Sequence, residues 1–198
     1  MNDVQRHREQ LNGLQGRPSL LFHVCCGVCS VWPLVYLRNY FRITIYYGNS
    51  NIYPESEYER RLETLEEYLE ILNDPEISLV IPPYDSDSYM KELSLYDDHQ
   101  EGGKRCCHCY EMRMKEAYDY AEENHYDYFT TVMSISSRKR ADYLNEIGGR
   151  LDKEHAHTRY LYADFKKDGG ITKNEEMNKE LHLYHQSYCG CVYSRREE

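Results

Sequence analysis

The fold of this chain is decided by the stretch Leu20-Leu21-Phe22-His23-Val24-Cys25-Cys26-Gly27-Val28-Cys29. The short apolar run from Ser19 to Val24 predicts a buried strand, and three cysteines follow it. A helix-like segment then runs from Ser30 to about Tyr40. In an open α/β sheet, ligands bind in the crevice at the carboxyl ends of the strands. The three cysteines therefore stand where we expect a functional site.

Strand-like and helix-like segments alternate along the rest of the chain. Strands are predicted from β-branched and aromatic residues at 42–47, 77–81, 126–133 and 160–163. Helices are predicted at 55–72, 85–95, 110–124, 137–148 and 171–184. We expect Ser136 or Ser137 to cap the helix at 137–148, and Gly148-Gly149 to end it.

This alternation predicts an α/β fold, a Rossmann-like and mostly parallel sheet with helices on both faces. We expect a single α/β domain over residues 1–198. It has an N-terminal leader at 1–17, helical or frayed, and a main domain at 18–198 that includes a Cys-Gly-Cys tail.

Composition and charge limit the classes of function. The formal net charge of −10 does not indicate a nucleic-acid binder, although small basic clusters such as Arg138-Lys139-Arg140 occur. The chain has no apolar stretch long enough to span a bilayer and no signal-peptide pattern, so we expect a cytoplasmic protein with no membrane partner. The 21 tyrosines fit a compositional bias, and some are candidates for stacking on nucleobases.

The eight cysteines fall into three groups, which argues for metal binding or redox chemistry in a reducing compartment. The adjacent pair Cys25-Cys26 and the Cys-x2-Cys pair Cys106 and Cys109 supply four thiolates. Four thiolates suit structural zinc or an iron–sulfur cluster. A vicinal pair fits a zinc knuckle poorly, and the ligands stand at a functional strand end. The spacing therefore favours a cluster over zinc.

The remaining cysteines have other interpretations. Cys189-Gly190-Cys191 can close only a small, strained ring, which is typical of a labile redox-active pair, with two further metal ligands as the alternative. Cys29 is a second-metal ligand, a packed thiol or a spare, and Cys107 has no assigned role. His23 is a packed core residue, a partner of a ligand, or a proton donor.

The sequence resembles the QueH-type, cobalamin-independent epoxyqueuosine reductases from about Leu20 to Ser194. The resemblance rests on five motifs in order, namely His23-Val24-Cys25-Cys26-Gly27-Val28-Cys29-Ser30, Tyr47-Gly48-Asn49-Ser50-Asn51-Ile52-Tyr53-Pro54, Arg105-Cys106-Cys107-His108-Cys109-Tyr110-Glu111-Met112-Arg113, Asp164-Phe165-Lys166-Lys167 and Tyr184-His185-Gln186-Ser187-Tyr188-Cys189-Gly190-Cys191-Val192-Tyr193-Ser194. The chain departs from the family pattern at Val28, at Ser187 and in the turn at 48–51. None of these departures removes a proposed ligand.

The resemblance implies the last step of queuosine biosynthesis, in which the epoxide of epoxyqueuosine at the tRNA wobble position is reduced to the alkene. It implies an adenine-nucleotide α-hydrolase-like fold and a 4Fe–4S cluster bound by Cys25, Cys26, Cys106 and Cys109. It also implies a redox-active pair at Cys189 and Cys191 and a second mononuclear iron, for which Cys29 and Asp85 are the candidate ligands. The electron donor is not identified.

A tRNA substrate directs attention to residues around the predicted loops. Anticodon-loop bases are recognised by stacking and their phosphates by basic side chains. The candidates for substrate contact are Tyr47, Asn51, Tyr53, Arg105, Arg138, Lys139, Tyr188 and Tyr193. His23 or a tyrosine hydroxyl is the candidate proton donor.

Two other functions compete with the reductase. One is an ATP-dependent tRNA-modifying enzyme of the same fold, but cysteines occupy the position where its glycine- and serine-rich phosphate loop should follow the first strand. The other is a zinc-binding, non-redox tRNA-binding module. A brown anaerobic preparation favours the cluster, whereas a colourless zinc-loaded one contradicts it.

Overall fold

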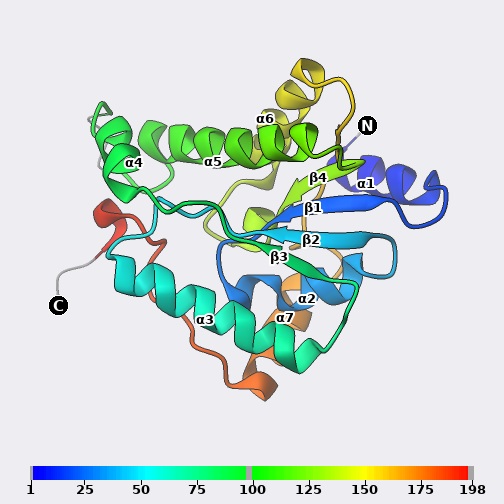
Figure 1. Ribbon diagram of the computed structural model, residues 1–198, viewed down its shortest axis with the longest axis horizontal. Helices are drawn as coiled ribbons and strands as arrows, with labels where there is room; N and C mark the ends of the chain where they lie inside the picture. Colours follow the sequence, from blue (N-terminus) through cyan, green and yellow to red (C-terminus); the bar gives the residue numbers. More distant parts are fainter. Residues whose placement is uncertain (1, 97–99, 196–198) are drawn as a thin grey trace.

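A five-stranded parallel sheet forms the centre of the molecule (Figure 1). The structure, a computed structural model, describes residues 2–96 and 100–195. The strand order is β3-β2-β1-β4-β5. The strands are β1 (Ser19–His23), β2 (Arg42–Tyr46), β3 (Ser78–Val80), β4 (Tyr128–Thr131) and β5 (Arg159–Tyr160). The α/β fold with a parallel sheet is therefore confirmed, although β5 has only two residues instead of the expected four.

Helices cover both faces of the sheet. In Figure 1, α2 (Gly27–Leu37), α3 (Glu55–Leu72) and α7 (Gly170–Leu181) lie on one face, and α5 (Lys104–Glu123) and α6 (Ala141–Glu154) lie on the other. The side chains of β1 alternate between these faces, as in any strand. Leu20 and Phe22 join the core beneath α2 and α3, whereas Leu21 joins the core beneath α5 and α6.

The strand order creates a crevice beside β1. The chain proceeds from β1 outward through β2 to β3, and then returns to place β4 on the other side of β1. The segments that follow β1 and β4 therefore diverge at the carboxyl edge of the sheet, where ligands bind in folds of this class. After β1 comes the cysteine loop, and after β4 come a 3₁₀ turn (Val132–Ile135) and residues 136–140.

Two helices begin earlier than the sequence predicted. Helix α2 begins at Gly27 rather than Ser30, so Cys26 is its N-cap and Cys29 lies in its first turn. Helix α5 begins at Lys104 rather than Tyr110, with Gly103 as N-cap. Its cysteines therefore stand on a helix and not in the loop before it.

The predicted end of the sixth helix is wrong. Helix α6 begins at Ala141, after an Arg140 cap, and continues through both glycines to Glu154. A Cβ atom on Gly148 would lie 2.2 Å from a carbon of the Tyr160 ring. Gly148 therefore lets the helix pack closely against Tyr160 and does not end it.

Three other elements match their predictions more closely. Helix α3 has the predicted bounds, and α4 (Ser86–Leu93) has Asp85 as its cap. The leader forms α1 (Asp3–Asn12), in which the Gln10 side chain donates to the Tyr160 carbonyl at 2.7 Å. No helix in the described ranges is long and apolar enough to cross a membrane.

Candidate metal and redox site

Three sulfur atoms gather directly after β1. The ligating atoms of Cys25, Cys26 and Cys29 all lie within 4.8 Å of one another. The structure pairs Cys26 with Cys29 in a disulfide, and the Cys25 sulfur lies 3.9 Å from that of Cys26. The buried strand β1 and the start of α2 hold this group. Because thiolates are soft ligands, these residues can bind iron or zinc once reduced.

The second cysteine pair lies on one face of α5. Cys106 and Cys109 are one helical turn apart, and Arg113 follows on the same face. Cys109 is 9% exposed and packs against Tyr89 of α4. Burial raises the pKa of the Cys109 thiol to about 12 and also raises the pKa of Cys106. The α5 helix thus presents one buried and one partly buried sulfur, both neutral unless a metal or another cation favours the thiolate.

Cys107 points away from this pair. Its sulfur lies 4.0 Å from the Gly102 carbonyl oxygen, and it borders a separate surface hollow with Tyr96 and Tyr143. Cys107 has no part in the thiol groups described above.

The C-terminal cysteines lie beside α3 and the start of α5, where the end of the chain returns to the carboxyl edge of the sheet (Figure 1). Both Cys189 and Cys191 are free thiols. Arg61, on the inner face of α3, donates to the carbonyls of Cys189 at 3.0 Å and Tyr188 at 3.1 Å. Gly190 between the two cysteines has φ +127°, a conformation that favours glycine.

Cys189 stands in a positive environment. Burial works against its ionisation, but the charges of Lys139, Arg113 and Arg61 outweigh burial and hold the pKa of Cys189 below its ordinary value. Reactive thiols occupy surroundings of this kind. Cys189 is therefore suited to react as a thiolate.

Arg113 connects the three cysteine groups. It is 2% exposed, and Cys25, Cys109 and Cys189 all interact electrostatically with its guanidinium. Its Nη2 donates to Asn49 Oδ1 at 2.7 Å, and Asn49 in turn donates to the Val24 carbonyl at 2.9 Å. This chain of hydrogen bonds joins α5 to the cysteine loop after β1.

His23 is fully buried next to Arg113. Its Nδ1 is 2.8 Å from the Thr131 hydroxyl, and its Nε2 is 3.3 Å from the Gly48 carbonyl and 3.4 Å from Arg113. Burial, followed by the Arg113 charge, lowers the pKa of His23 well below its ordinary value. The imidazole is therefore neutral, and it contacts Arg113 rather than the cleft.

A cavity of about 280 Å³ opens at the carboxyl edge of the sheet. Cys25 and Cys29 line it from the β1 side, residues 132, 133 and 135–139 from the β4 side, and Gln186 and Cys189 from the C-terminal segment. Gln186 donates to the Cys26 sulfur at 3.0 Å, while its buried Oε1 has no partner in the described structure. The cavity thus unites two of the three cysteine groups with a basic loop.

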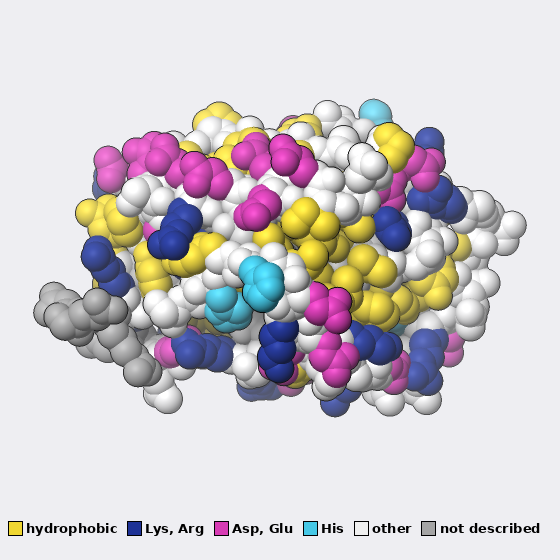
Figure 2. Space-filling view, turned by 90° about the horizontal axis from the view of Figure 1, so that it is seen from below, with side chains coloured by type: hydrophobic (Ala, Val, Ile, Leu, Met, Phe, Trp, Pro, Cys, Tyr) yellow, Lys and Arg dark blue, Asp and Glu magenta, His cyan; other side chains and the backbone are white. Residues whose placement is uncertain are grey.

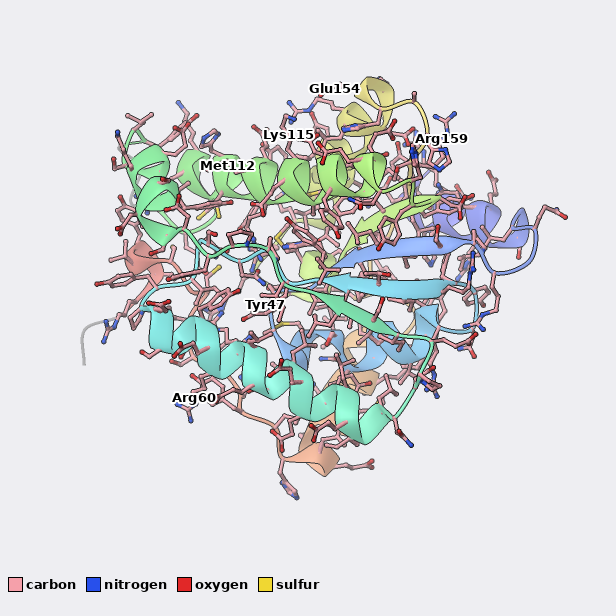
Figure 3. The ribbon with its side chains drawn as sticks, viewed as in Figure 1. Tyr47, Arg60, Met112, Lys115, Glu154 and Arg159 are labelled. Atoms are coloured by element: carbon pink, nitrogen blue, oxygen red, sulfur yellow. A yellow bond between two sulfur atoms is a disulfide. The ribbon has the colours of Figure 1, made fainter. Side chains whose placement is uncertain are left out.

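Two residues predicted to contact substrate are buried instead. Tyr47 is 0% exposed, lies in the interior above α3 (Figure 3), and donates its hydroxyl to the Tyr58 carbonyl. Asn51 is 1% exposed. Burial leaves neither side chain exposed to a base at the surface, and the Asn51 Oδ1 atom is buried without a partner in the described structure. The loop that follows β2 folds inward, which its turn-forming composition did not reveal.

Asp85 has a different role from the one predicted. It is exposed and caps α4 by accepting from the Ser88 amide at 3.0 Å. Asp85 is not a member of the compact ligand group formed by Cys25, Cys26 and Cys29. The hydrogen bond to the helix end accounts for this aspartate without a metal.

The other substrate candidates are partly or fully exposed, except Arg105, which is 4% exposed and does not line the cavity. Tyr53 is 41% exposed and Tyr193 is 38% exposed. The Arg105 guanidinium stacks 3.8 Å from the Tyr193 ring centre, and the Tyr188 hydroxyl donates to the Tyr53 carbonyl. Arg138 and Lys139 border the cavity itself.

Sequence reasoning missed Arg61, Arg113 and Gln186. Arg61 replaces an apolar residue in the buried stripe of α3, between Tyr58 and Leu65, and a charged residue at such a position is a signal. Arg113 continues the face of Cys106 and Cys109 at helical spacing, but only once the helix is known to begin at Lys104. Nothing in the local sequence marks Gln186.

Comparisons with known proteins are consistent with one another. Residues 20–197 match the family model of epoxyqueuosine reductase QueH. The chain is 36% identical over 183 residues to epoxyqueuosine reductase QueH of Streptococcus pyogenes, covering 91% of this chain and 71% of that protein. It is also 36% identical over 187 residues to epoxyqueuosine reductase QueH of Staphylococcus aureus, covering 92% and 78%.

A solved structure shares the fold at low identity. The U34-tRNA thiolase NcsA from Methanococcus maripaludis with its [4Fe-4S] cluster superimposes with a TM-score of 0.61 and 16% identity. The match covers 98% of this chain and 67% of that one. At this identity, the likeness supports the fold alone.

Proposed function

Because this chain belongs to the epoxyqueuosine reductase QueH family, we propose that it reduces the epoxide of epoxyqueuosine in tRNA to the alkene of queuosine. The family match over residues 20–197 is the observation that carries this proposal. The reaction removes one oxygen as water and consumes two electrons and two protons. The chain must therefore hold an electron source next to a cleft that admits one modified nucleoside.

We further propose that Cys25, Cys26, Cys106 and Cys109 bind a 4Fe–4S cluster. Four soft donors from two elements suit the group, and the buried Arg113 Nε and Gln186 Oε1, both without partners in the described structure, fit a site designed for an additional polar occupant. When bound, the cluster supplies electrons one at a time. Because only the thiolate binds metal, all four cysteines would hold the cluster in their deprotonated form.

Cys29 is the remaining thiol of the compact group and is the better candidate for a second mononuclear iron. Asp85 is engaged at the end of α4 and is not assigned.

The Cys189 and Cys191 thiols can supply both electrons of the reaction. When two thiols form a disulfide they release two electrons and two protons, which balance the conversion of one epoxide into one alkene and one water. Cys189 lines the cavity and is the thiol that we expect to face the substrate. A separate electron donor, not identified here, must then reduce the disulfide.

The protons of the reaction come from the thiols rather than from His23. His23 was predicted as a donor, but its lowered pKa and its absence from the residues that line the cavity favour a different task, namely holding Thr131, Gly48 and Arg113 in place. The two thiol protons released with the electron pair satisfy the stoichiometry without His23.

The tRNA should approach from the mouth of the cavity and not across α3. Exposed glutamates cover the outer face of α3. Figure 2 shows acidic side chains gathered along the upper left edge of the molecule. These charges repel phosphates. Arg138 and Lys139 at the cavity instead attract them, and Tyr53, Tyr188 and Tyr193 offer rings for neighbouring bases.

The domain organisation is part of the proposal. Helix α1 packs on the sheet edge through Gln10 and through His7, whose Nδ1 lies 2.6 Å from the Tyr162 carbonyl. We therefore treat residues 1–17 as a part of the single α/β domain 1–198.

The test is a complementation assay with nucleoside analysis. A strain that lacks its own epoxyqueuosine reductase is given this gene, and its tRNA is digested and separated. Queuosine in place of its epoxide is the expected result, and a Cys189→Ser variant that leaves the epoxide unreduced is the matched negative control. Unreduced epoxide in the strain that expresses the unaltered chain would refute the function.

A further inference from the structure

The buried guanidinium of Arg113 has no carboxylate to neutralise it. In the described part of the chain, no Asp or Glu lies within ion-pair distance of Arg113, and the side chain is 2% exposed. Its neutral partner is the amide oxygen of Asn49, and its Nε has no hydrogen-bond partner. A buried, unpaired cation is strongly unfavourable. An anionic group must therefore complete this site.

The groups that surround Arg113 identify the missing charge. Cys25, Cys109 and Cys189 are the cysteines that act electrostatically on it, and they come from three separate elements. The Cys109 thiol is neutral, and a Cys189 thiolate is shared among Lys139, Arg113 and Arg61, so these thiols do not balance the Arg113 charge by themselves. A cluster bound by four thiolates has a net negative charge in both oxidation states, and it gains a further negative charge on reduction.

We propose that Arg113 is the counter-cation of the metal centre, and that its charge stabilises the reduced form. The inference rests on the proposed function. Arg113 is a positioning residue, because it acts through the centre and does not contact substrate. Its bond to Asn49, which donates to the Val24 carbonyl, fixes the guanidinium beside the cysteine loop.

The choice of variants separates charge from shape. Arg113→Met removes the charge but keeps a long side chain, whereas Arg113→Lys keeps the charge and loses the forked geometry. Arg38→Met is the control for net charge, since Arg38 lies at the end of α2 and pairs with Asp74 at 3.4 Å. All chains are reconstituted anaerobically with iron and sulfide.

The measurement is the midpoint potential of the reconstituted centre in a dithionite titration, with iron content as a second readout. We expect the midpoint potential of Arg113→Met to be more negative by at least about 59 mV, which is a tenfold change in the ratio of reduced to oxidised centre for one electron. Arg113→Lys and Arg38→Met should stay close to the unaltered protein. If Arg113→Met cannot bind iron while Arg113→Lys can, the result also supports the proposal that the metal centre needs a positive charge at this position.

Two outcomes overturn the inference alone. One is a loaded Arg113→Met protein with an unchanged potential. The other is failure of both Arg113→Met and Arg113→Lys to bind iron, which would assign the guanidinium a purely geometric role. If the unaltered chain binds no iron, the proposed function itself fails, and the inference fails with it.

Discussion

The cysteine loop after β1 and the Cys-Gly-Cys segment near the end of the chain have the same chemical groups but are held by different means. The first follows a strand whose Leu20, Leu21 and Phe22 are 0% exposed, and it continues directly into α2. The second is held mainly by individual polar contacts. Arg61 binds two of its carbonyls, and the Tyr53 amide donates to the Gly190 carbonyl at 2.8 Å.

This difference matches two chemical tasks. A metal centre requires several ligands fixed in one geometry, which a packed strand end and a helix provide. A dithiol that alternates between substrate and reductant needs freedom to move, and segments with few buried contacts open at low energetic cost. The comparison predicts that damage to the first region abolishes the metal centre, whereas damage to the second abolishes turnover alone.

The largest effect should follow the loss of one proposed ligand. Cys106→Ala should yield a protein with little bound iron and no activity, because three thiolates cannot complete the site. Cys107→Ala is the matched control, since Cys107 is the next residue on α5 and borders a different surface hollow. Iron and sulfide analysis after anaerobic reconstitution checks both. Full iron content in Cys106→Ala would remove this residue from the ligand set.

Loss of a thiol in the second region should separate iron binding from turnover. Cys189→Ser should retain the iron content of the unaltered protein but fail to form queuosine, because one thiol cannot supply two electrons. The variant is assayed on tRNA that contains epoxyqueuosine. Normal turnover would show that the Cys189 and Cys191 pair has no part in the reaction.

The sequence predicted those parts of the fold and site that depend on local pattern. The strand at 19–24 and the α3 helix are encoded by apolar runs and by helical spacing, so their positions were correct. The place of Cys25 and Cys26 at the carboxyl edge of the sheet also followed from the rule for such sheets, whereas the ligand set that joins them to Cys106 and Cys109 stays a prediction.

The errors arose where tertiary packing overrides local preference. Gly148 resembles a residue that ends a helix, but in the structure it leaves room for the ring of Tyr160. Because Tyr160 lies outside α6, the sequence pattern of the helix could not reveal this contact. Tyr47 looks like an exposed loop aromatic but is buried against Tyr58. The role of Arg113 could be recognised only once the register of α5 and the position of Asn49 were known. No single segment of the sequence encodes both.

A smaller effect should follow the release of the C-terminal segment from α3. Arg61→Met removes two charge-assisted hydrogen bonds, and because even one such bond contributes about 1.5–3 kcal/mol, we expect activity to fall by at least roughly 10-fold. Iron content should not change. Arg60 projects outward from α3 (Figure 3) but stacks on Tyr184 of the same C-terminal segment, so the control is Arg38→Met, which removes the same charge at the end of α2.

Hydrogen exchange provides the direct readout for this variant. Amides of residues 187–192 should exchange faster in Arg61→Met, while those of β1 and α2 stay protected. Equal acceleration in both regions would mean that Arg61 stabilises the whole domain, and the contrast between the two cysteine regions would then be lost.

The smallest effect concerns the ionisation of Cys189. Among the charges that lower its pKa, Lys139 acts most strongly, so Lys139→Met should raise this pKa. Alkylation by iodoacetamide follows the thiolate, and its midpoint should therefore move to higher pH. Peptide mapping isolates the Cys189 signal, and Lys167→Met, which removes an exposed lysine outside the cavity lining, is the control. An unchanged midpoint in Lys139→Met would show that the basic loop after β4 does not activate this thiol. In that case only Arg61 and Arg113 would lower the pKa of Cys189.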